Sequence, residues 1–389
     1  MPELANKSQC TGCTACASIC PQQCICMDVD AEGFTYPTIE NDSVCISCGI
    51  CERVCPVLNK KENSESLTKA YAAFSKNDLL RMESSSGGIF SELSKAILQS
   101  GGIVYGASYS KNYIVEHISI DSIETLEKLR GAKYSQSNLG ESFQTIKNQL
   151  NSGKKILFSG TPCQVAGLKA FLVHDYDNLI CIDFVCHGVP SPMVWKEYVK
   201  YRARTDDDST GLKRINLRNK ESGWSKYTYS VEFTYSDNKR YLCNNQDDPF
   251  MRFFVNDYIL RQSCSDCHFK GYDRVSDITL GDFWGIWDIV PEMDDNKGTS
   301  LILTHSVKGE QLFKTVSENV KYKQVALEQT SKINQSMLRS SVHQSNREQV
   351  LHKIAQEGFQ SALPLFTVEQ PSKVSISRKI KNVLSKLLN

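Results

Sequence analysis

The sequence has no charge excess and no long apolar run. Its 45 lysines and arginines against 44 aspartates and glutamates leave a formal net charge of +1. Nucleic-acid-binding proteins usually carry a basic excess on one face, so this balance argues against that class. No stretch approaches the ~20 apolar residues that cross a bilayer. The first residues, MPELANK, contain no apolar segment of a secretory signal. We therefore expect a cytoplasmic protein that binds no nucleic acid.

Cysteine, by contrast, is abundant, with 16 residues in 389. A reducing compartment keeps thiols free, and free thiols in that number are typical of metal ligands. Half of them form two copies of the pattern C-x2-C-x2-C-x3-C-P. In this pattern the first three cysteines hold one 4Fe–4S cluster and the fourth ligates the other cluster. We therefore expect one cluster on Cys10, Cys13, Cys16 and Cys55, and a second on Cys45, Cys48, Cys51 and Cys20.

Zinc is the alternative, since it also binds Cys-x2-Cys pairs. Zinc sites use two separated pairs, whereas here three cysteines are crowded within seven residues, twice. The pattern therefore favours iron–sulfur clusters. Cys24 and Cys26 alternate along an expected strand, and we interpret them as small packing residues.

The rest of the chain predicts a mixed α/β body. Residues 60–68 are polar and charged, and we expect them to link residues 1–59 to a body over 69–340. Residues 155–185 contain a short apolar strand, the turn SGTPC, a helix and a second apolar strand, which predicts a parallel βαβ unit. The fold class is α+β: a two-cluster ferredoxin-type domain, a mixed α/β domain, and a helical tail over 341–389.

The end of that tail, residues 373–389, has apolar residues on one helical face and several lysines and arginines besides. A basic amphipathic helix can lie on an anionic membrane surface. It can also dock on the body or on a partner, and the sequence leaves both readings open.

Two Ser/Gly-rich turns precede predicted helices, at 84–88 and 159–162. Such turns offer free backbone N–H groups to a phosphate, although serine and glycine are also ordinary N-caps. No G-x-G-x-x-G or Walker A pattern is present, so no standard NAD or ATP site is predicted.

Four further cysteines could form a third metal site. Cys264 and Cys267 have the spacing of a metal-binding pair. Cys163 and Cys186 each follow a predicted parallel strand, so they would lie at the same C-terminal edge of the sheet. A structural zinc at Cys264 and Cys267 is the alternative.

The cysteine runs and several further stretches of the chain resemble the coenzyme F420 hydrogenase/dehydrogenase beta-subunit family, in the version with an N-terminal 4Fe–4S dicluster domain. The resemblance extends in order from about Cys10 to Gly285. Beyond the cysteine runs, the matching stretches are SSSGGIFSEL, GGIVYGA, LRGAKYSQS, LFSGTPCQVAGLK, VCHGVPSP, DPFMRFF, CSDCHFKG and SDITLGDFWGI.

The resemblance implies an iron–sulfur flavoprotein. Members of the family bind FAD in the body domain and exchange a hydride between the flavin and a partner cofactor, which is F420 in archaeal relatives. Electrons then pass singly through 4Fe–4S clusters to another subunit or carrier. For this chain the resemblance implies flavin contacts at Ser86, Gly87, Gly88, Lys133, Tyr134, Ser135, Gly160, Thr161, Pro162 and Gln164. It also implies a third cluster on Cys163, Cys186, Cys264 and Cys267.

The expected function is therefore that of an FAD-dependent iron–sulfur oxidoreductase. It would move electrons between a reduced carrier, ferredoxin or F420, and an organic substrate or a partner subunit. Nothing in the sequence identifies residues that bind F420. The alternative is a non-catalytic electron-transfer subunit that keeps the fold without the flavin.

Overall fold

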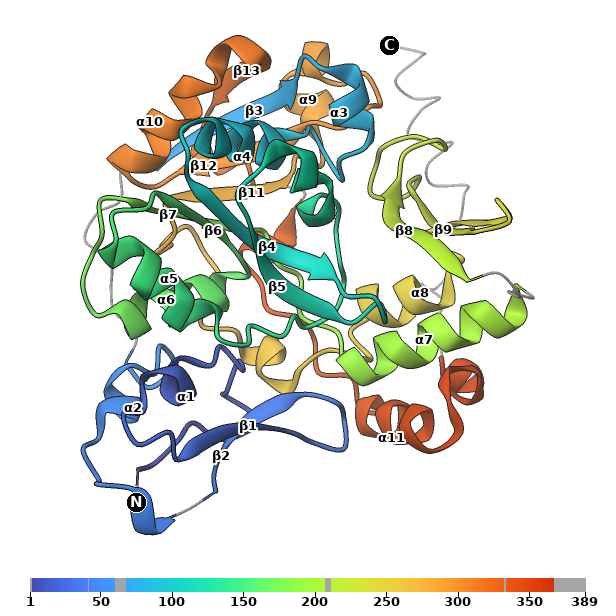
Figure 1. Cartoon of the computed structure of the whole chain (residues 1–389). Coiled ribbons are helices and arrows are strands. Elements are labelled where there is room, and N and C mark those ends of the chain that lie inside the picture. The colour runs from blue at the N-terminus through green and yellow to red at the C-terminus, as the bar shows by residue number, and fades with distance from the viewer. Residues whose placement is uncertain (1, 41, 60–67, 207–210, 332–333, 367–389) are drawn as a thin grey trace, which may run out of the picture.

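The computed structural model describes residues 2–40, 42–59, 68–206, 211–331 and 334–366. Helices and three sheets occur together in this part of the chain, as expected for the α+β class (Figure 1). The amphipathic helix expected over 373–389 lies outside the described residues. Within the described ranges, no helix is long and apolar enough to cross a bilayer.

The N-terminal module is small and is built around its two cysteine runs. Its elements are α1 (Ala15–Ile19), β1 (Ile25–Val29), β2 (Thr35–Ile39) and α2 (Ile50–Arg53). β1 pairs antiparallel with β2, and each cysteine run passes through a short helix. Each helix is entered through a left-handed residue, Thr14 at φ 65° and Gly49 at φ 67°. These turns bring the cysteines of each run round to one side.

An eight-stranded mixed sheet forms the centre of the body, in the order β13-β3-β12-β11-β7-β6-β4-β5. Its strands are β3 (Lys69–Ser75), β4 (Ile103–Tyr109), β5 (Val115–Ile120), β6 (Ile156–Ser159), β7 (Leu179–Phe184), β11 (Ile278–Asp282), β12 (Ser300–Thr304) and β13 (Val320–Val325). β4, β6, β7 and β11 are parallel, whereas the remaining neighbours pair antiparallel. The predicted βαβ unit is confirmed, because β6 and β7 are parallel and α6 connects them.

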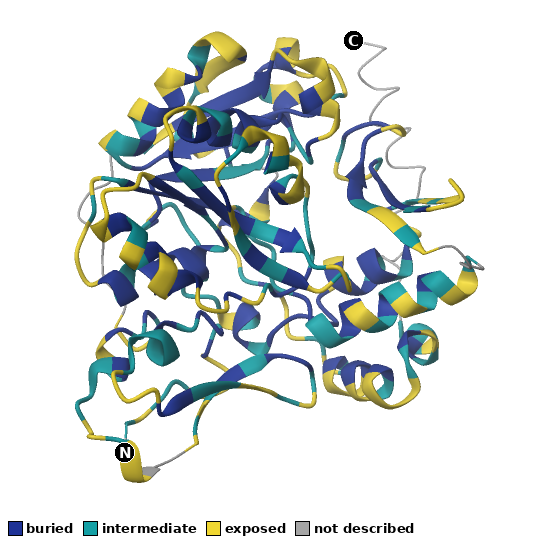
Figure 2. Ribbon diagram, viewed as in Figure 1, coloured by how far each residue is buried: buried dark blue, intermediate teal, exposed yellow. Residues whose placement is uncertain are grey.

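Helices cover both faces of this sheet. They are α4 (Ile89–Gln99) and α10 (Val307–Thr315) on one face, and α5 (Ser142–Asn151) and α6 (Pro162–Leu172) on the other. In β7, Ile180 and Ile182 pack with the α4 side, whereas Leu179 and Cys181 pack with the α5 and α6 side. Figure 2 shows the strands buried between helices whose outer faces are exposed. Two-sided burial explains the nearly continuous apolar sequence of these strands.

Short helices α3 (Asp78–Met82) and α9 (Ile286–Ile289) lie at the β3 and β11 side of the sheet. A second, aromatic-rich core lies beside the large sheet (Figure 1). It joins α7 (Pro192–Thr205), α8 (Pro249–Val255) and α11 (Arg347–Glu357) to the antiparallel sheet β8 (Leu212–Asn219), β9 (Ser230–Tyr235) and β10 (Arg240–Asn244). The hairpin predicted after residue 227 is the β9–β10 pair.

The N-terminal module is fixed to the body by close packing and by an ion pair. A Cβ on Gly167 of α6 would lie 2.7 Å from Cys13 Cβ, so only glycine permits this approach. From α11, Arg347 binds both carboxylate oxygens of Glu32, at 2.9 and 2.6 Å. The cysteines of the module are therefore held at a defined place against the body.

Candidate functional site

A cavity of about 310 Å³ opens at the carboxyl ends of β6 and β7. This is the edge of a parallel sheet where ligands usually bind, and the volume lies at the lower end of the ~300–1,000 Å³ typical of ligand sites. Most of the residues expected to contact a flavin border this cavity. They are Ser86, Gly88, Lys133, Tyr134, Ser135, Gly160, Thr161 and Gln164.

The two other expected residues do not border it. Gly87 faces the neighbouring strands, where an added Cβ would lie 2.5 Å from Ala73 O, and its N–H donates to Ser300 Oγ. Gly87 therefore lets the serine turn lie against the sheet. Pro162 occupies the first turn of α6 and borders a smaller cavity next to the large one.

The two Ser/Gly-rich turns differ in how their helices are capped. At α6, Thr161 Oγ1 accepts from Gln164 N, and Thr161 N donates to the Gln164 side chain. This capping box satisfies two of the N–H groups that a phosphate would need. At α4 the N-cap is Gly88, with φ 85° and no capping side chain. Of the two turns, the one before α4 is the better phosphate site.

Arg130 and His117 also border the cavity, and no sequence pattern singled out either residue. Arg130 Nε donates to Ser91 Oγ at 3.3 Å, which places a cation near the first turn of α4. His117 lies on β5, a strand that the sequence analysis did not predict.

His117 and Lys133 are both buried beside this cavity. Burial lowers the pKa of His117 to about 4, so the ring is neutral at pH 7. Its Nε2 lies 3.0 Å from Ser159 O and must carry the proton, and its Nδ1 has no partner among the described residues. Burial also lowers the pKa of Lys133 to about 7, while its Nζ donates to Arg130 O at 2.9 Å. Both groups could respond to charge on a bound ligand.

A second, smaller cavity of about 30 Å³ lies next to the first. The four body cysteines of the proposed third site all border it: Cys163, Cys186, Cys264 and Cys267. Burial raises the pKa of Cys163 to about 11 and that of Cys264 to about 12. Neutral thiols are therefore favoured there unless a metal displaces their protons.

Three cations border the same small cavity. Arg261 and Arg274 are buried, and Lys270 Nζ donates to Cys186 O at 2.5 Å. A set of four thiolates would be strongly anionic, and cations that border the same cavity would stabilise that negative charge. The charge of the surroundings therefore fits a thiolate-bound metal group.

A single zinc ion and a four-iron cluster require different spacings of their four thiolates. Tetrahedral zinc bonds of ~2.3 Å place thiolates roughly 3.8 Å apart. The four thiols surround a shared cavity, as the ligands of a four-iron cluster would.

The N-terminal cysteines also surround two cavities, each of about 20 Å³. One is bordered by Cys10, Cys13, Cys16 and Cys55, and the other by Cys20, Cys45, Cys48 and Cys51. The structure therefore groups the eight cysteines in the crossed arrangement that their spacing predicts.

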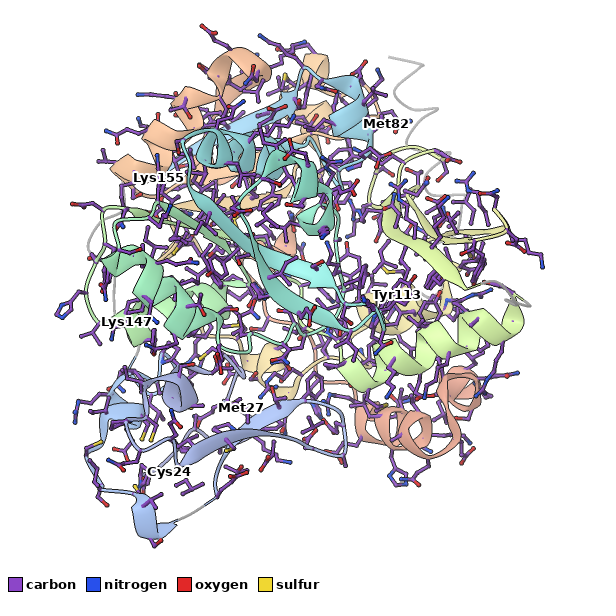
Figure 3. All side chains as sticks on the ribbon, in the orientation of Figure 1. Cys24, Met27, Met82, Tyr113, Lys147 and Lys155 are labelled. Atoms are coloured by element: carbon purple, nitrogen blue, oxygen red, sulfur yellow. The ribbon has the colours of Figure 1, made fainter. Side chains whose placement is uncertain are left out.

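Cys24 borders the second of these N-terminal cavities. We expected it to be a packing residue, and it is buried, but its Sγ also lies 3.4 Å from Cys20 Sγ. Figure 3 labels Cys24 in the N-terminal module, where several sulfur atoms gather.

Three of the four cavities share lining residues. Cys163 and Cys186 border both the large cavity and the four-cysteine cavity of the body. Thr11 borders these two and also the cavity of Cys10. These three cavities therefore share walls, an arrangement that favours electron transfer between groups bound in them.

Two known families match separate parts of the chain. Residues 153–330 match the family described as the C terminus of the coenzyme F420 hydrogenase/dehydrogenase beta subunit, and residues 9–59 match the 4Fe-4S dicluster domain. No curated protein sequence matches the chain. Among solved structures, a chain of the F420-reducing [NiFe] hydrogenase complex from Methanosarcina barkeri aligns with 82% of this chain and 97% of its own length. The sequence identity is 15% and the TM-score 0.46, a similarity too low to support an argument about function.

Proposed function

Because residues 153–330 match the C terminus of the coenzyme F420 hydrogenase/dehydrogenase beta subunit and residues 9–59 match the 4Fe-4S dicluster domain, we propose that this chain is an FAD-dependent iron–sulfur oxidoreductase. It moves electrons between FAD in the large cavity and three 4Fe–4S clusters. Its donor is a reduced carrier, ferredoxin or F420, and its acceptor is an organic substrate or a partner subunit. The observation that carries this proposal is that Cys163 and Cys186 border both the large cavity and the four-cysteine cavity.

The residues of the large cavity support FAD as its ligand. The uncapped N-terminus of α4 and the nearby Arg130 suit the pyrophosphate. Lys133 and His117 lie at the same cavity, and each offers a polar group to a heteroaromatic ring. Bound FAD would supply the chemistry that the side chains lack, because a flavin accepts two electrons together and releases them singly.

The cysteine groups support the path for single electrons. We propose one cluster on Cys163, Cys186, Cys264 and Cys267, and two more on the crossed groups of the N-terminal module. The second N-terminal group borders a cavity that shares no lining residue with the large cavity. Val44 and Ile46 beside it are exposed, so a redox partner protein could bind there.

Anaerobic purification with quantified FAD, iron and sulfide tests the proposal. Three clusters predict about twelve iron atoms per chain, taking four per cluster, together with one FAD. About eight iron atoms per chain together with FAD would contradict only the third cluster and leave the rest of the proposal intact. A preparation with all of the about twelve iron atoms but no FAD would contradict the proposal that the protein is a flavin-dependent enzyme. The alternative of a non-catalytic electron-transfer subunit would then remain, and the large cavity would have another role.

A further inference from the structure

A chain of hydrogen bonds connects the start of β3 to the wall of the large cavity. Thr68 Oγ1 lies 3.1 Å from His305 Nδ1. On the other side of the ring, His305 Nε2 lies 2.9 Å from Thr279 Oγ1, which in turn donates to Asp183 Oδ1. Asp183 borders the cavity at the end of β7. Four side chains from separate parts of the sequence thus form one continuous path.

The path is half-exposed at one end and buried along the rest. Thr68 is half-buried, whereas His305 is 8% exposed and Thr279 is fully buried. β11 and β12 hold the inner residues in register, since Ile278 pairs with Thr304 and Thr279 with Leu303. The geometry is therefore set by the central sheet and not by a surface loop.

The donors and acceptors all point in one direction. An ionised Asp183 can only accept, so Thr279 donates its hydroxyl proton to it. Thr279 Oγ1 must then accept from His305 Nε2–H, which leaves Nδ1 to accept from Thr68. Burial and the nearby charge of Arg274 lower the pKa of His305 to about 3, which agrees with a neutral ring. Each group thus donates toward the cavity.

The proposed function requires a proton to cross this wall. A hydride is two electrons and one proton, whereas an iron–sulfur cluster carries one electron and no proton. When two electrons from clusters and a hydride are exchanged at one ligand, one proton must enter or leave for each turnover. The cluster path cannot carry it.

We propose that Thr68, His305, Thr279 and Asp183 form a proton path between solvent and the large cavity. In the inward direction Thr68 passes a proton to His305 Nδ1 and takes one from water. The Nε2 proton moves to Thr279 Oγ1, and the Thr279 proton moves to Asp183. Because the ring gains one proton as it loses another, it holds no lasting charge. The inference rests on the proposed function, since a protein without hydride chemistry needs no such path.

A purely structural network is the alternative. Arg274 Nη1 lies 3.5 Å from Asp183 Oδ2, so this ion pair alone gives the carboxylate a partner. A structural role predicts that loss of the Thr279 hydroxyl changes stability but leaves the rate of proton uptake unchanged. The test must therefore measure proton movement separately from folding.

The test compares Thr279→Val, which removes the relay hydroxyl at nearly constant shape, with Thr279→Ser, which keeps it. Anaerobic holoenzyme is reduced by photogenerated methyl viologen radical, a one-electron donor, in weak buffer with a pH-indicator dye. We expect Thr279→Val to slow proton uptake at least about tenfold and Thr279→Ser to stay within about twofold of wild type, because a positioned proton donor contributes 10²–10⁴ in rate. Cluster reduction should keep its wild-type rate in both variants.

Wild-type proton uptake in folded, flavin-loaded Thr279→Val would overturn the path. If that variant does not fold, His305→Gln replaces it, because glutamine keeps a hydrogen bond but cannot pass a proton. A preparation with clusters and no flavin contradicts the proposed function instead. The path is then judged by ¹⁵N NMR of histidine-labelled protein, where the His305 signal is identified by its loss in His305→Gln. Protonated Nε2 with bare Nδ1 supports the path, and the opposite tautomer overturns it.

Discussion

The guanidinium of Arg261 lies against the sulfur of Cys10, with Nη2 3.7 Å from Sγ. Its Nε donates to Cys10 O, its Nη groups donate to Gln136 Oε1 and Thr35 O, and its guanidinium lies 4.1 Å from the centre of the Tyr36 ring. Arg261 is 1% exposed, and no carboxylate pairs with it among the residues that the structure describes. A buried cation without an anion is costly. Anionic clusters on both sides of Arg261 would provide the missing negative charge, because it also borders the four-cysteine cavity of the body.

Replacing Arg261 should therefore change reduction potentials. A cation stabilises the reduced, more negative state of a nearby cluster, so Arg261→Gln should lower the potential of the cluster at Cys10. One 1.4 kcal/mol step corresponds to about 59 mV for one electron, and we expect a shift of at least that size. EPR-monitored redox titration measures it. Arg214→Gln is the control, because Arg214 is half-exposed, pairs with Glu83 and borders none of the four cavities. Equal shifts in both variants would refute the role of Arg261.

The third cluster predicts a specific loss of iron. Cys163→Ala should remove about four of twelve iron atoms and leave the two N-terminal clusters, taking four atoms per cluster. Cys181→Ala is the matched control, because Cys181 is also buried in the body but packs in the core away from the small cavity. Iron analysis with EPR spin counting decides the matter. Unchanged iron in Cys163→Ala would show that this thiol is not a ligand.

Arg130 should contribute to flavin binding. If it neutralises a phosphate near α4, Arg130→Gln should weaken FAD binding about tenfold or more, since a charge-assisted hydrogen bond is worth roughly 1.5–3 kcal/mol. Flavin fluorescence during titration of deflavinated protein gives the dissociation constant. The exposed neighbour Lys128 supplies the control variant Lys128→Gln. Equal affinity for wild type and Arg130→Gln would place the phosphates elsewhere.

Buried histidines should make the protein less stable in mild acid. Burial lowers the pKa of His117 to about 4, whereas the unfolded value is ~6.5. As pH falls from 6.5 toward 4, the unfolded chain takes up a proton that the folded protein does not, so stability decreases by up to about 1.4 kcal/mol per pH unit per histidine. His117→Phe should flatten this dependence in urea unfolding, and the surface variant His174→Gln should not. An unchanged slope in His117→Phe would mean that the ring titrates normally in the folded protein.

The sequence predicted best what depends on local spacing. The crossed grouping of the N-terminal cysteines follows from the interval between ligands, and the structure arranges them in that way. The β6–α6–β7 unit was also predictable, because a short apolar strand, a Thr-Pro N-cap and a second apolar strand follow one another directly.

Residues that reach the site from distant strands were not predictable. No sequence motif contains Arg261, His117 or His305. The periodicity of apolar residues does not show whether a polar side chain is buried at a site or exposed to solvent. Arg261 meets Cys10 across 251 positions of sequence. Only the tertiary fold brings such pairs together. Gly87 is an error of the opposite kind. It lies in a turn whose sequence suggests ligand binding, but it is needed for the packing of that turn on the sheet.

The most direct test of the central claim is a count of electrons. Anaerobic titration of the purified protein with dithionite, followed by absorbance and EPR, measures how many electrons each chain accepts. One FAD and three clusters predict about five, two for the flavin and one for each cluster. A chain that takes up only about two electrons, with no flavin signal, would contradict a protein in which FAD and three clusters act together.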